Sequence, residues 1–243
     1  MTDFKSSNFL KKLLVGLIFT GLAVILIWFL FFKSELNNQK ESMNQNEIIL
    51  PQPEKRSETS LEEAISIRRS VREYKDEPLS LKEVSQILWS AQGITSSGGG
   101  RTAPSAGALY PLEVYLVARK VAGIEPGIYH YLPREHKLSK VLEGDISAEL
   151  AQAALSQTFI KEAAANLVIT AFFARTTGKY GERGVRYVHM EAGHAAQNVY
   201  LQAQSLKLGT VTIGAFSDEE VKKLLRLPEE ETPLYIMPLG KIK

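Results

Sequence analysis

The chain has 243 residues, with 29 basic and 27 acidic side chains and a formal net charge of +2. Such an even balance is not typical of a general nucleic-acid-binding protein, so we expect no nucleic-acid partner. Cysteine is absent, which excludes a disulfide-stapled scaffold, a zinc ribbon, an iron–sulfur protein and a cysteine nucleophile. The length permits one sizeable domain with an appendage.

Residues 13–32 form an uninterrupted apolar segment without a charge. As a helix this segment would be about 30 Å long, which matches the hydrocarbon core of a bilayer. It has no polar face, which argues against a buried core helix. No small-residue cleavage site precedes Lys33, which argues against a cleaved signal peptide. We therefore predict a transmembrane signal anchor over 13–32.

The flanking lysines set the expected orientation of this anchor. Three precede the segment and two follow it: Lys5, Lys11 and Lys12, then Lys33 and Lys40. The excess on the N-terminal side predicts a single-pass membrane protein whose tail, residues 1–12, is cytoplasmic and whose catalytic domain is extracytoplasmic. Residues 33–59 are polar and lack periodicity, so we predict a flexible linker that leads to a folded domain over 60–243.

Helical and strand patterns alternate irregularly through that domain. Ser60, Ser80 and Ser217 are each followed three residues later by Glu, which predicts three capped helix starts. The longest helix is predicted over 185–206 from its apolar spacing, and 167–174 is predicted to be a central strand buried on both faces. Further strands are predicted at 114–118, 127–131, 137–142, 210–213 and 234–239. Because strict βαβ alternation is missing, we predict an α+β domain with a mixed sheet.

Two segments early in the domain carry groups suited to ligand binding. Residues 68–72 read RRSVR, and this cluster is either a solvated charge run or a phosphate site, since guanidinium forks and a hydroxyl suit phosphate. The loop 96–111 lacks the Lys-Ser/Thr ending of a P-loop and a preceding strand. It is either a flexible surface loop or a segment whose small residues let backbone approach a flat ligand closely.

Two later segments stand where loops often hold functional groups. Residues 178–187 lie between the predicted central strand and the long helix. They are either a loop that holds functional groups on a rigid scaffold or a helix-entry loop with ordinary surface charges. At 209–217 a predicted strand runs into two small residues just before a capped helix. His189 and His194 are five residues apart, which misses the same-face helical pairing, so we predict no metal site. No GxSxG motif is present, so an esterase is not supported.

Four motifs in order resemble the FMN-dependent nitroreductase family, and more closely its SagB-type branch of thiazole/oxazole-forming (azoline) dehydrogenases. They read SIRRSVREY, RTAPSAGALYPLEVYLV, KYGERGVRYVHMEAGHAAQNVYLQA and LGTVTIGAF. The resemblance covers residues 60–243. It implies an α+β sandwich, FMN as the cofactor and an intertwined homodimer in which both chains contribute to each FMN site.

The resemblance also implies roles for individual residues. Around the FMN phosphate and ribityl chain it places Arg68, Arg69 and Ser70, and near flavin N1 and O2 it places Arg72. Against the ring near N5 it places Gly214 and Ala215. From the partner chain it places Pro104, Ser105, Ala106 and Ala108.

Lys179 and Tyr180 resemble the Lys-Tyr pair that is assigned to proton removal in the azoline dehydrogenases. A Lys of lowered pKa, or a Tyr beside a cation, suits that task. The chain departs from the typical family pattern at Gly214, where Glu is common, and at its short C-terminus. Lys241 and Lys243 remain there to bind phosphate, with Arg101 as a substitute.

We therefore expect an FMN-dependent oxidoreductase that acts by ping-pong hydride transfer. The resemblance favours dehydrogenation of a small organic molecule or a peptide heterocycle. Reduction of a quinone or a nitro compound is the alternative. A third hypothesis is a non-catalytic, tethered flavin-binding or assembly protein, motivated by Gly214 and the short C-terminus.

Overall fold

The computed structural model describes residues 28–29, 32–33 and 46–243. Residues 47–243 form one compact unit. The predicted membrane-spanning segment lies outside the described residues, apart from Trp28, Phe29 and Phe32. In the part of the chain that the structure describes, no helix has the length and apolar character needed to cross a bilayer.

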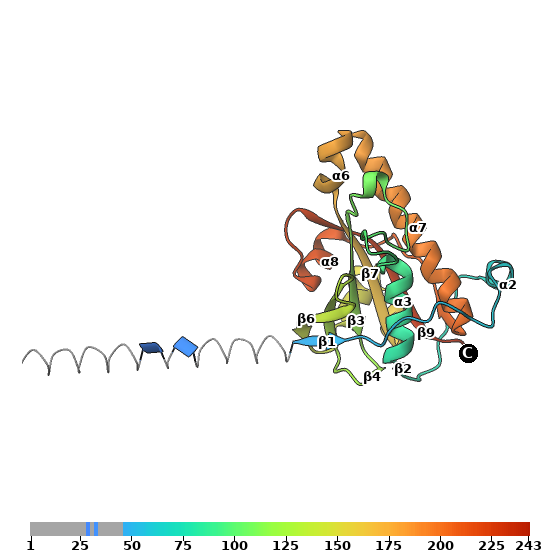
Figure 1. Cartoon of the computed structure of the whole chain (residues 1–243). Coiled ribbons are helices and arrows are strands. Elements are labelled where there is room, and N and C mark those ends of the chain that lie inside the picture. Colours follow the sequence, from blue (N-terminus) through green and yellow to red (C-terminus); the bar gives the residue numbers. More distant parts are fainter. Residues whose placement is uncertain (1–27, 30–31, 34–45) are drawn as a thin grey trace, which may run out of the picture. The chain divides into compact units, whose positions relative to one another are not determined.

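A seven-stranded sheet forms the centre of the compact unit (Figure 1). Its strands lie in the order β1-β6-β5-β3-β7-β9-β8. Their bounds are β1 Glu47–Ile49, β3 Leu112–Ala118, β5 Gly127–Leu132, β6 Lys137–Glu143, β7 Ala165–Phe172, β8 Leu208–Thr210 and β9 Glu231–Lys241. Every pairing within this sheet is antiparallel. A parallel pairing occurs in a separate two-stranded sheet of β2 (Leu79–Ser80) and β4 (Val121–Ala122). The expected mixture of directions therefore arises between the two sheets and not inside the main one.

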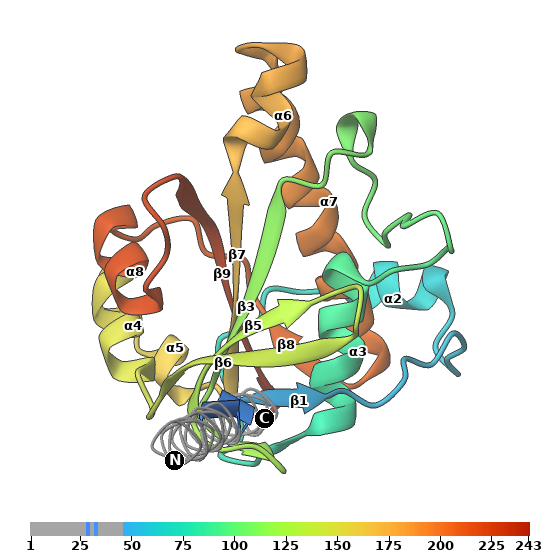
Figure 2. The ribbon, with the colours of Figure 1, turned by 60° about the vertical axis from the view of Figure 1, so that its left-hand side comes forward.

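Helices cover both faces of the main sheet (Figure 2). On one face lie α3 (Leu81–Gln92) and the long α7 (Arg183–Ser205), and on the other lie α4 (Ser147–Ala153), α5 (Phe159–Glu162) and α8 (Asp218–Leu225). Neighbouring residues of β3 show why two cores form. Leu116 packs in the core under α3 and α7, whereas Val117 packs in the core under α4, α5 and α8, because side chains alternate across a strand. Burial on both faces explains the continuous apolar sequence of β7.

Local sequence signals placed several boundaries correctly. The hydroxyls of Ser60, Ser80 and Ser217 all accept a backbone N–H at the starts of α2 (Leu61–Ile67), α3 and α8. At α3 the capping box is complete, because the Ser80 backbone N–H also donates to Glu83 Oε2 at 2.8 Å. The long helix and the hairpin of β5 and β6 lie where the periodicity predicts them.

Three expectations need correction. The segment predicted as a linker contributes β1, which pairs with β6, and Leu50, which is buried, so the folded unit begins at Glu47 and not at residue 60. The predicted loop at 178–187 is helical except at Gly181 and Glu182, because α6 (Phe173–Tyr180) follows β7 directly and α7 begins at Arg183. The strand predicted at 210–213 ends at Thr210, and Ile213 forms an isolated bridge with Ile236.

The helix α6 and the start of α7 project beyond the end of the sheet in both views (Figures 1 and 2). The short 3-10 helix η1 (Ala106–Ala108) lies near this projection. The fold thereby brings the loop after α3 and the end of α6 to the same end of the molecule.

Candidate active site

The basic segment that follows α2 lies against the C-terminal half of α7 and the end of β8. The Val71 N–H donates to the carbonyl oxygen of Thr210 at 2.9 Å. Ser70 Oγ lies 3.2 Å from Tyr200 Oη, and the same phenol oxygen accepts the Thr212 N–H at 2.8 Å. The Arg68 guanidinium carbon is 5.0 Å from the centroid of the Tyr200 ring. A cation, two hydroxyls and the backbone of 210–212 therefore meet at one place.

Tyr200 is the group at the centre of this cluster, and the sequence interpretation did not include it. Its burial raises the pKa of the phenol, but the hydrogen bonds from Ser70 and Thr212 and the positive charge of Arg68 outweigh burial, so the pKa lies below its ordinary value. A phenol at a buried position of an amphipathic helix needs a partner for its hydroxyl. That was the signal available in the sequence.

The other two arginines of the segment point elsewhere. Arg69 is exposed and turns back to donate from Nη1 to the carbonyl oxygens of Ser66 at 3.1 Å and of Arg68 at 2.8 Å. Arg72 is exposed, with its guanidinium carbon 5.7 Å from the centroid of the Phe159 ring. The structure therefore joins Arg68 and Ser70 into one cluster and separates Arg69 from it.

The chain after β8 presents an open backbone beside this cluster. Gly214 and Ala215 are exposed, and the carbonyl oxygen of Ala215 accepts Gln157 Nε2 at 3.1 Å. A methyl group placed on Gly214 would meet the Tyr235 ring at 3.8 Å, an ordinary contact. Packing therefore does not require glycine at position 214. The absence of a side chain there leaves space beside the backbone. A cavity of about 360 Å³ adjoins it, lined by Gly214, Phe173, His189, Phe216 and Tyr235, among others.

The loop after α3 is held together by its own contacts. Arg101 Nη1 donates to Gln92 Oε1 at 2.8 Å and to the Leu112 carbonyl oxygen at 3.4 Å, and its guanidinium carbon lies 4.7 Å from the centroid of the Tyr110 ring. Burial lowers the pKa of Arg101. Its partners lie in α3, β3 and the loop itself and not in the segment 68–72, so this arrangement does not favour Arg101 as a phosphate ligand.

The tip of this loop faces the end of α6. Pro104 and Ala108 are exposed, and Ser105 and Ala106 are half-buried. Gly107 has a φ of +65°, and a methyl group on it would lie 2.8 Å from Tyr180 Oη and 3.0 Å from Lys179 Nζ. Two segments that are far apart in the sequence therefore meet here. Gly107 suits the left-handed backbone of the loop tip, and a side chain there would displace the ends of Lys179 and Tyr180.

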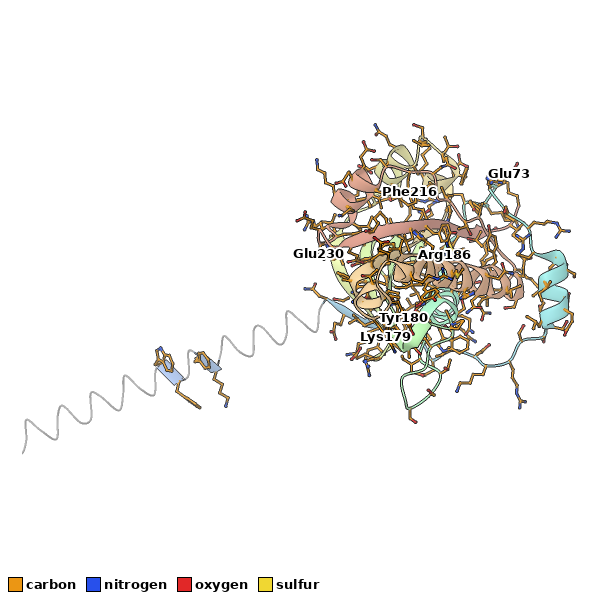
Figure 3. All side chains as sticks on the ribbon, turned by 90° about the horizontal axis from the view of Figure 1, so that it is seen from above. Glu73, Lys179, Tyr180, Arg186, Phe216 and Glu230 are labelled. Carbon is orange, nitrogen blue, oxygen red and sulfur yellow. The ribbon has the colours of Figure 1, made fainter. Side chains whose placement is uncertain are left out.

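Lys179 and Tyr180 form the end of α6 (Figure 3), where Lys179 is exposed and Tyr180 is half-buried. Lys179 Nζ is 5.5 Å from the centroid of the Tyr180 ring. The Tyr180 ring packs edge-on against Tyr187 of α7, with centroids 5.2 Å apart. The predicted pair is thus brought together, on a helix and not on a loop.

Arg175 ties the base of α6 to the same loop. It donates to the Tyr110 carbonyl oxygen at 3.1 Å and lies 2.6 Å from Glu113 Oε1. Burial raises the pKa of Glu113, but hydrogen bonds from His130 and Arg175 outweigh it, and the carboxyl pKa is lowered overall. The sequence interpretation missed Arg175 and Glu113, since nothing local to either residue indicates that they meet.

The remaining predicted residues lie apart from these clusters. Lys241 forms an ion pair with Glu83 at the start of α3, so it already has a carboxylate partner. His189 packs edge-on against Phe173, with ring centroids 5.4 Å apart, and lines the cavity beside Gly214. His194 is exposed.

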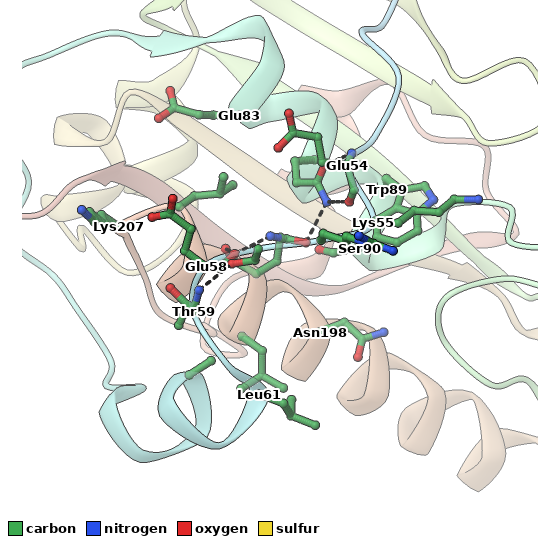
Figure 4. Close-up of a pocket in the computed structure, with 18 of the residues that line it drawn as sticks. Glu54, Lys55, Glu58, Thr59, Leu61, Glu83, Trp89, Ser90, Asn198 and Lys207 are labelled. Atoms are coloured by element: carbon green, nitrogen blue, oxygen red, sulfur yellow. Dashed lines mark hydrogen bonds between the residues drawn. The ribbon is translucent and has the colours of Figure 1, made fainter.

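A second, larger groove of about 1050 Å³ lies between α3, the C-terminal part of α7 and the chain that leads into α2 (Figure 4). Trp89 and Asn198 line it from the two helices, Thr59 lines it from the segment before α2, and Leu61 lines it from the first position of α2. Gln86 Nε2 spans part of its floor, donating to the Glu54 carbonyl oxygen and to Gln202 Oε1, both at 2.9 Å. None of the predicted site residues lines this groove.

A model of the nitroreductase family matches residues 65–241. The chain belongs to the nitroreductase family. It is 51% identical, over 195 residues, to a protein of Methanocaldococcus jannaschii assigned to the nitroreductases, covering 80% of this chain and 96% of that one. It is 29% identical, over 181 residues, to the microcin B17-processing protein of Escherichia coli, covering 68% of this chain and 63% of that one.

The fold agrees with this assignment. The structure of the Escherichia coli microcin synthetase complex with truncated pro-MccB17 bound superposes with a TM-score of 0.63 and 26% identity, over 81% of this chain and 78% of that chain. The resemblance to the nitroreductase family, including its peptide-processing members, is therefore confirmed. The chain is an oxidoreductase of a flavin-dependent family, with FMN as the implied cofactor.

The residues present fit such a cofactor. A flavin mononucleotide offers a dianionic phosphate, a polyhydroxyl chain and a flat ring. Arg68, Ser70 and the Tyr200 hydroxyl supply donors for the first two, and the exposed backbone at Gly214 and Ala215 leaves room for the third.

Proposed function

We propose that this protein is an FMN-dependent dehydrogenase of an organic substrate, acting by ping-pong hydride transfer. The observation that carries the proposal is the cluster of Arg68, Ser70, Tyr200 and the Thr212 N–H beside the open backbone of Gly214. This cluster brings together groups that bind a phosphate and hydroxyls, and it lies next to open backbone where a flat ring can lie.

The chain's own residues have two tasks. One group would bind and orient the cofactor, and another would accept a proton from the substrate. Arg68 and Ser70 would hold the phosphate and ribityl end, Arg72 would stabilise negative charge near N1 and O2, and the backbone of 214–215 would lie near N5. Bound FMN supplies an acceptor for the hydride that the substrate loses. The substrate's proton leaves to Lys179 Nζ or Tyr180 Oη, and a separate electron acceptor completes the second half-reaction.

We further propose that the complete site forms between two copies of the chain. Ser105 lies beside Glu191 on α7, nine positions before Tyr200, which is about 13.5 Å of helix rise. The loop tip with Lys179 and Tyr180 therefore lies well separated from the Arg68 cluster in one chain. A homodimer in which each flavin contacts both clusters accounts for this separation.

The substrate class follows from the relatives. Similarity to a microcin-processing protein, and to a synthetase complex with a precursor peptide bound, supports a peptide heterocycle as substrate. The chain spans 63% of the length of the microcin-processing protein, so this part of the proposal rests on the shared domain. Reduction of a quinone or a nitro compound is the second candidate, favoured by the 51% identity to the Methanocaldococcus protein.

We also propose that residues 13–32 anchor the protein in a membrane, with the catalytic domain extracytoplasmic. The support is the uncharged apolar sequence and the lysine distribution around it. Protease treatment of intact cells tests the orientation, because a domain outside the membrane is digested, whereas full protection of the domain contradicts the proposal.

The first experiment is the visible absorption spectrum of the purified full-length protein. Bound flavin that is released as FMN on denaturation supports the proposed function. A colourless protein that takes up no added FMN contradicts the proposed function. The same result also contradicts a non-catalytic role in flavin binding. Anaerobic bleaching by a candidate substrate then separates the dehydrogenase from the reductase, which instead needs a reduced donor.

A further inference from the structure

Glu113 stands at the start of β3, where the sheet meets the base of α6. In the antiparallel pairing Leu112 lies opposite Ala171, so the start of β3 runs beside the end of β7. The helix α6 begins directly after β7, at Phe173. The Glu113 side chain is 13% exposed. A carboxylate so largely removed from water is destabilising unless it is paired and hydrogen-bonded, so its partners show what it holds.

Both carboxylate oxygens of Glu113 are engaged. Its Oε1 lies 2.6 Å from Arg175 Nη1 on α6, and its Oε2 lies 2.9 Å from His130 Nε2 on β5. Burial raises the pKa of Glu113, but hydrogen bonds from these two partners outweigh it, so the group is a carboxylate at neutral pH. His130 is in turn stacked on Tyr115, with ring centroids 4.7 Å apart. One oxygen is thus fixed to the sheet, and the other is presented to α6.

Arg175 connects this carboxylate to the loop before β3. The Nη1 that contacts Glu113 also donates to the Tyr110 carbonyl oxygen at 3.1 Å. A terminal guanidinium nitrogen carries two hydrogens, so it serves the carboxylate and the carbonyl together. The guanidinium carbon also lies 4.5 Å from the centroid of the Phe172 ring. Arg175 therefore ties the base of α6 both to the sheet and to Tyr110.

The backbone of Tyr110 needs such support. Its φ is +47°, in the left-handed region that residues with a side chain rarely adopt. A conformation of this kind persists only where the surroundings hold it. The Tyr110 N–H donates to Ser105 Oγ at 2.9 Å, and the Arg101 guanidinium lies against the Tyr110 ring. With Arg175 on the carbonyl oxygen, the amide, the ring and the carbonyl group of Tyr110 are each held by a different side chain.

The same loop reaches the proposed proton acceptors at its tip. Gly107 lies so close to Tyr180 Oη and Lys179 Nζ that a side chain on it would displace them. Lys179 follows Arg175 by about one helical turn. The loop and α6 thus meet at two places, at the base through Arg175 and at the tip through Gly107, so a shift at the base alters the contact at the tip.

We propose that Glu113 is a positioning residue, which orients Arg175 and thereby sets the place of Lys179 and Tyr180 against the loop. The catalytic consequence rests on the proposed function, but the structural part does not. Because both oxygens of Glu113 are engaged, it acts on the proton acceptors through Arg175 and not on the substrate.

Hydrogen exchange of the Tyr110 amide in the full-length protein tests the structural part without flavin or substrate. Glu113→Ala and Arg175→Ala should each speed exchange by about tenfold or more, as expected for the loss of a charge-assisted hydrogen bond. The double variant should be no faster than the faster single variant, because both changes break the same pair. Glu113→Gln keeps the size of the side chain and loses only its charge, and it should speed exchange by about fivefold.

Two control variants match these changes. Asp76→Ala breaks an ion pair with Arg119, just after the opposite end of β3. Glu149→Gln removes a carboxylate from an exposed position on α4. Both should leave Tyr110 exchange unchanged, and a control that speeds it as much as Glu113→Gln overturns the proposal. Unchanged exchange in Arg175→Ala, whose side chain is exposed and whose loss the fold tolerates, or full additivity of the two single variants overturns it as well.

Turnover tests the catalytic part. With FMN retained, Glu113→Ala and Arg175→Ala should each lower kcat by about tenfold or more, since a displacement of about 1 Å in a catalytic group has effects of that order. In a protein that already carries Lys179→Ala and Tyr180→Phe, Glu113→Ala should lower kcat no further, because the groups that it positions are gone. An equal fall of kcat in both backgrounds indicates a general structural loss and overturns the positioning role.

The two readouts keep this proposal apart from the proposed function. If the wild type carries no flavin, the proposed function fails, whereas Tyr110 exchange still decides the structural part. If the wild type is active, normal kcat in an Arg175→Ala protein with faster Tyr110 exchange overturns the catalytic part.

Discussion

Replacing Glu191 by Gln should change how the stability of the protein depends on pH. In the folded protein burial raises the carboxyl pKa from 4.5 to about 7. A group whose pKa is raised on folding contributes stability that is complete below its unfolded pKa and is lost as pH rises through its folded pKa. The wild type therefore loses stability from this group between about pH 4.5 and pH 7, and Gln, which has no proton to lose, does not.

The size of the effect follows from the two pKa values. With about 1.4 kcal/mol for each pH unit between them, the proton linkage amounts to about 3 kcal/mol in full. About 2.5 kcal/mol of it falls between pH 5 and pH 8. Because Glu191 is 3% exposed, solvent screening removes little of this. On going from pH 5 to pH 8, the free energy of unfolding of Glu191→Gln should thus rise by that amount relative to the wild type.

Urea unfolding followed by tryptophan fluorescence measures this difference, since Trp89 lies half-buried in α3. Both proteins are compared at one protomer concentration, because association would shift the apparent stability. Glu149→Gln serves as control and should run parallel to the wild type. Parallel curves for Glu191→Gln and the wild type would refute the reasoning that Glu191 is buried with a raised pKa.

Three further outcomes are expected. Lys179→Ala should lower kcat by about 100-fold or more while FMN stays bound, as for loss of a general base, and stopped-flow bleaching measures it. An unchanged kcat would contradict the role of Lys179 as the proton acceptor. Arg68→Ala should weaken FMN binding by about tenfold or more, since a charge-assisted bond to phosphate is lost, and Arg69→Ala by less than threefold in fluorescence titration; equal losses would contradict the separation of the two side chains. Gly107→Ala should lower both stability, by about 1–2 kcal/mol, and activity, because the methyl group strikes the end of α6. Gly99→Ala, at a similar positive φ with nothing nearby, should lower only stability.

Much of the fold could be read from local patterns. The Ser80 capping box, the long helix and the hairpin of β5 and β6 depend on residues close in sequence. Such local interactions form independently of the tertiary arrangement of the chain. The strand β1 could not be read this way. Its three residues pair with β6 about 90 positions later, and such pairing leaves no local pattern.

The candidate site divides in the same manner. The four motifs identified the family and placed Arg68, Ser70 and the Lys-Tyr pair among the candidate residues. Glu191 also left a trace, because it occupies the buried face of α7 three residues after Val188. The apolar spacing of α7 predicts which helix face is buried, but it does not explain why a carboxyl group lies on that face.

The sequence by itself determined the family, the helix caps, the central strand and the types of residue that the site uses. Only the tertiary structure decided that Arg68 meets Tyr200 while Arg69 turns away, that Lys241 is paired with Glu83, and that Gly107 closes on Tyr180. The physical reason is that capping and periodicity act within a few residues, whereas a pKa, an ion pair or a close approach depends on segments that only packing brings together.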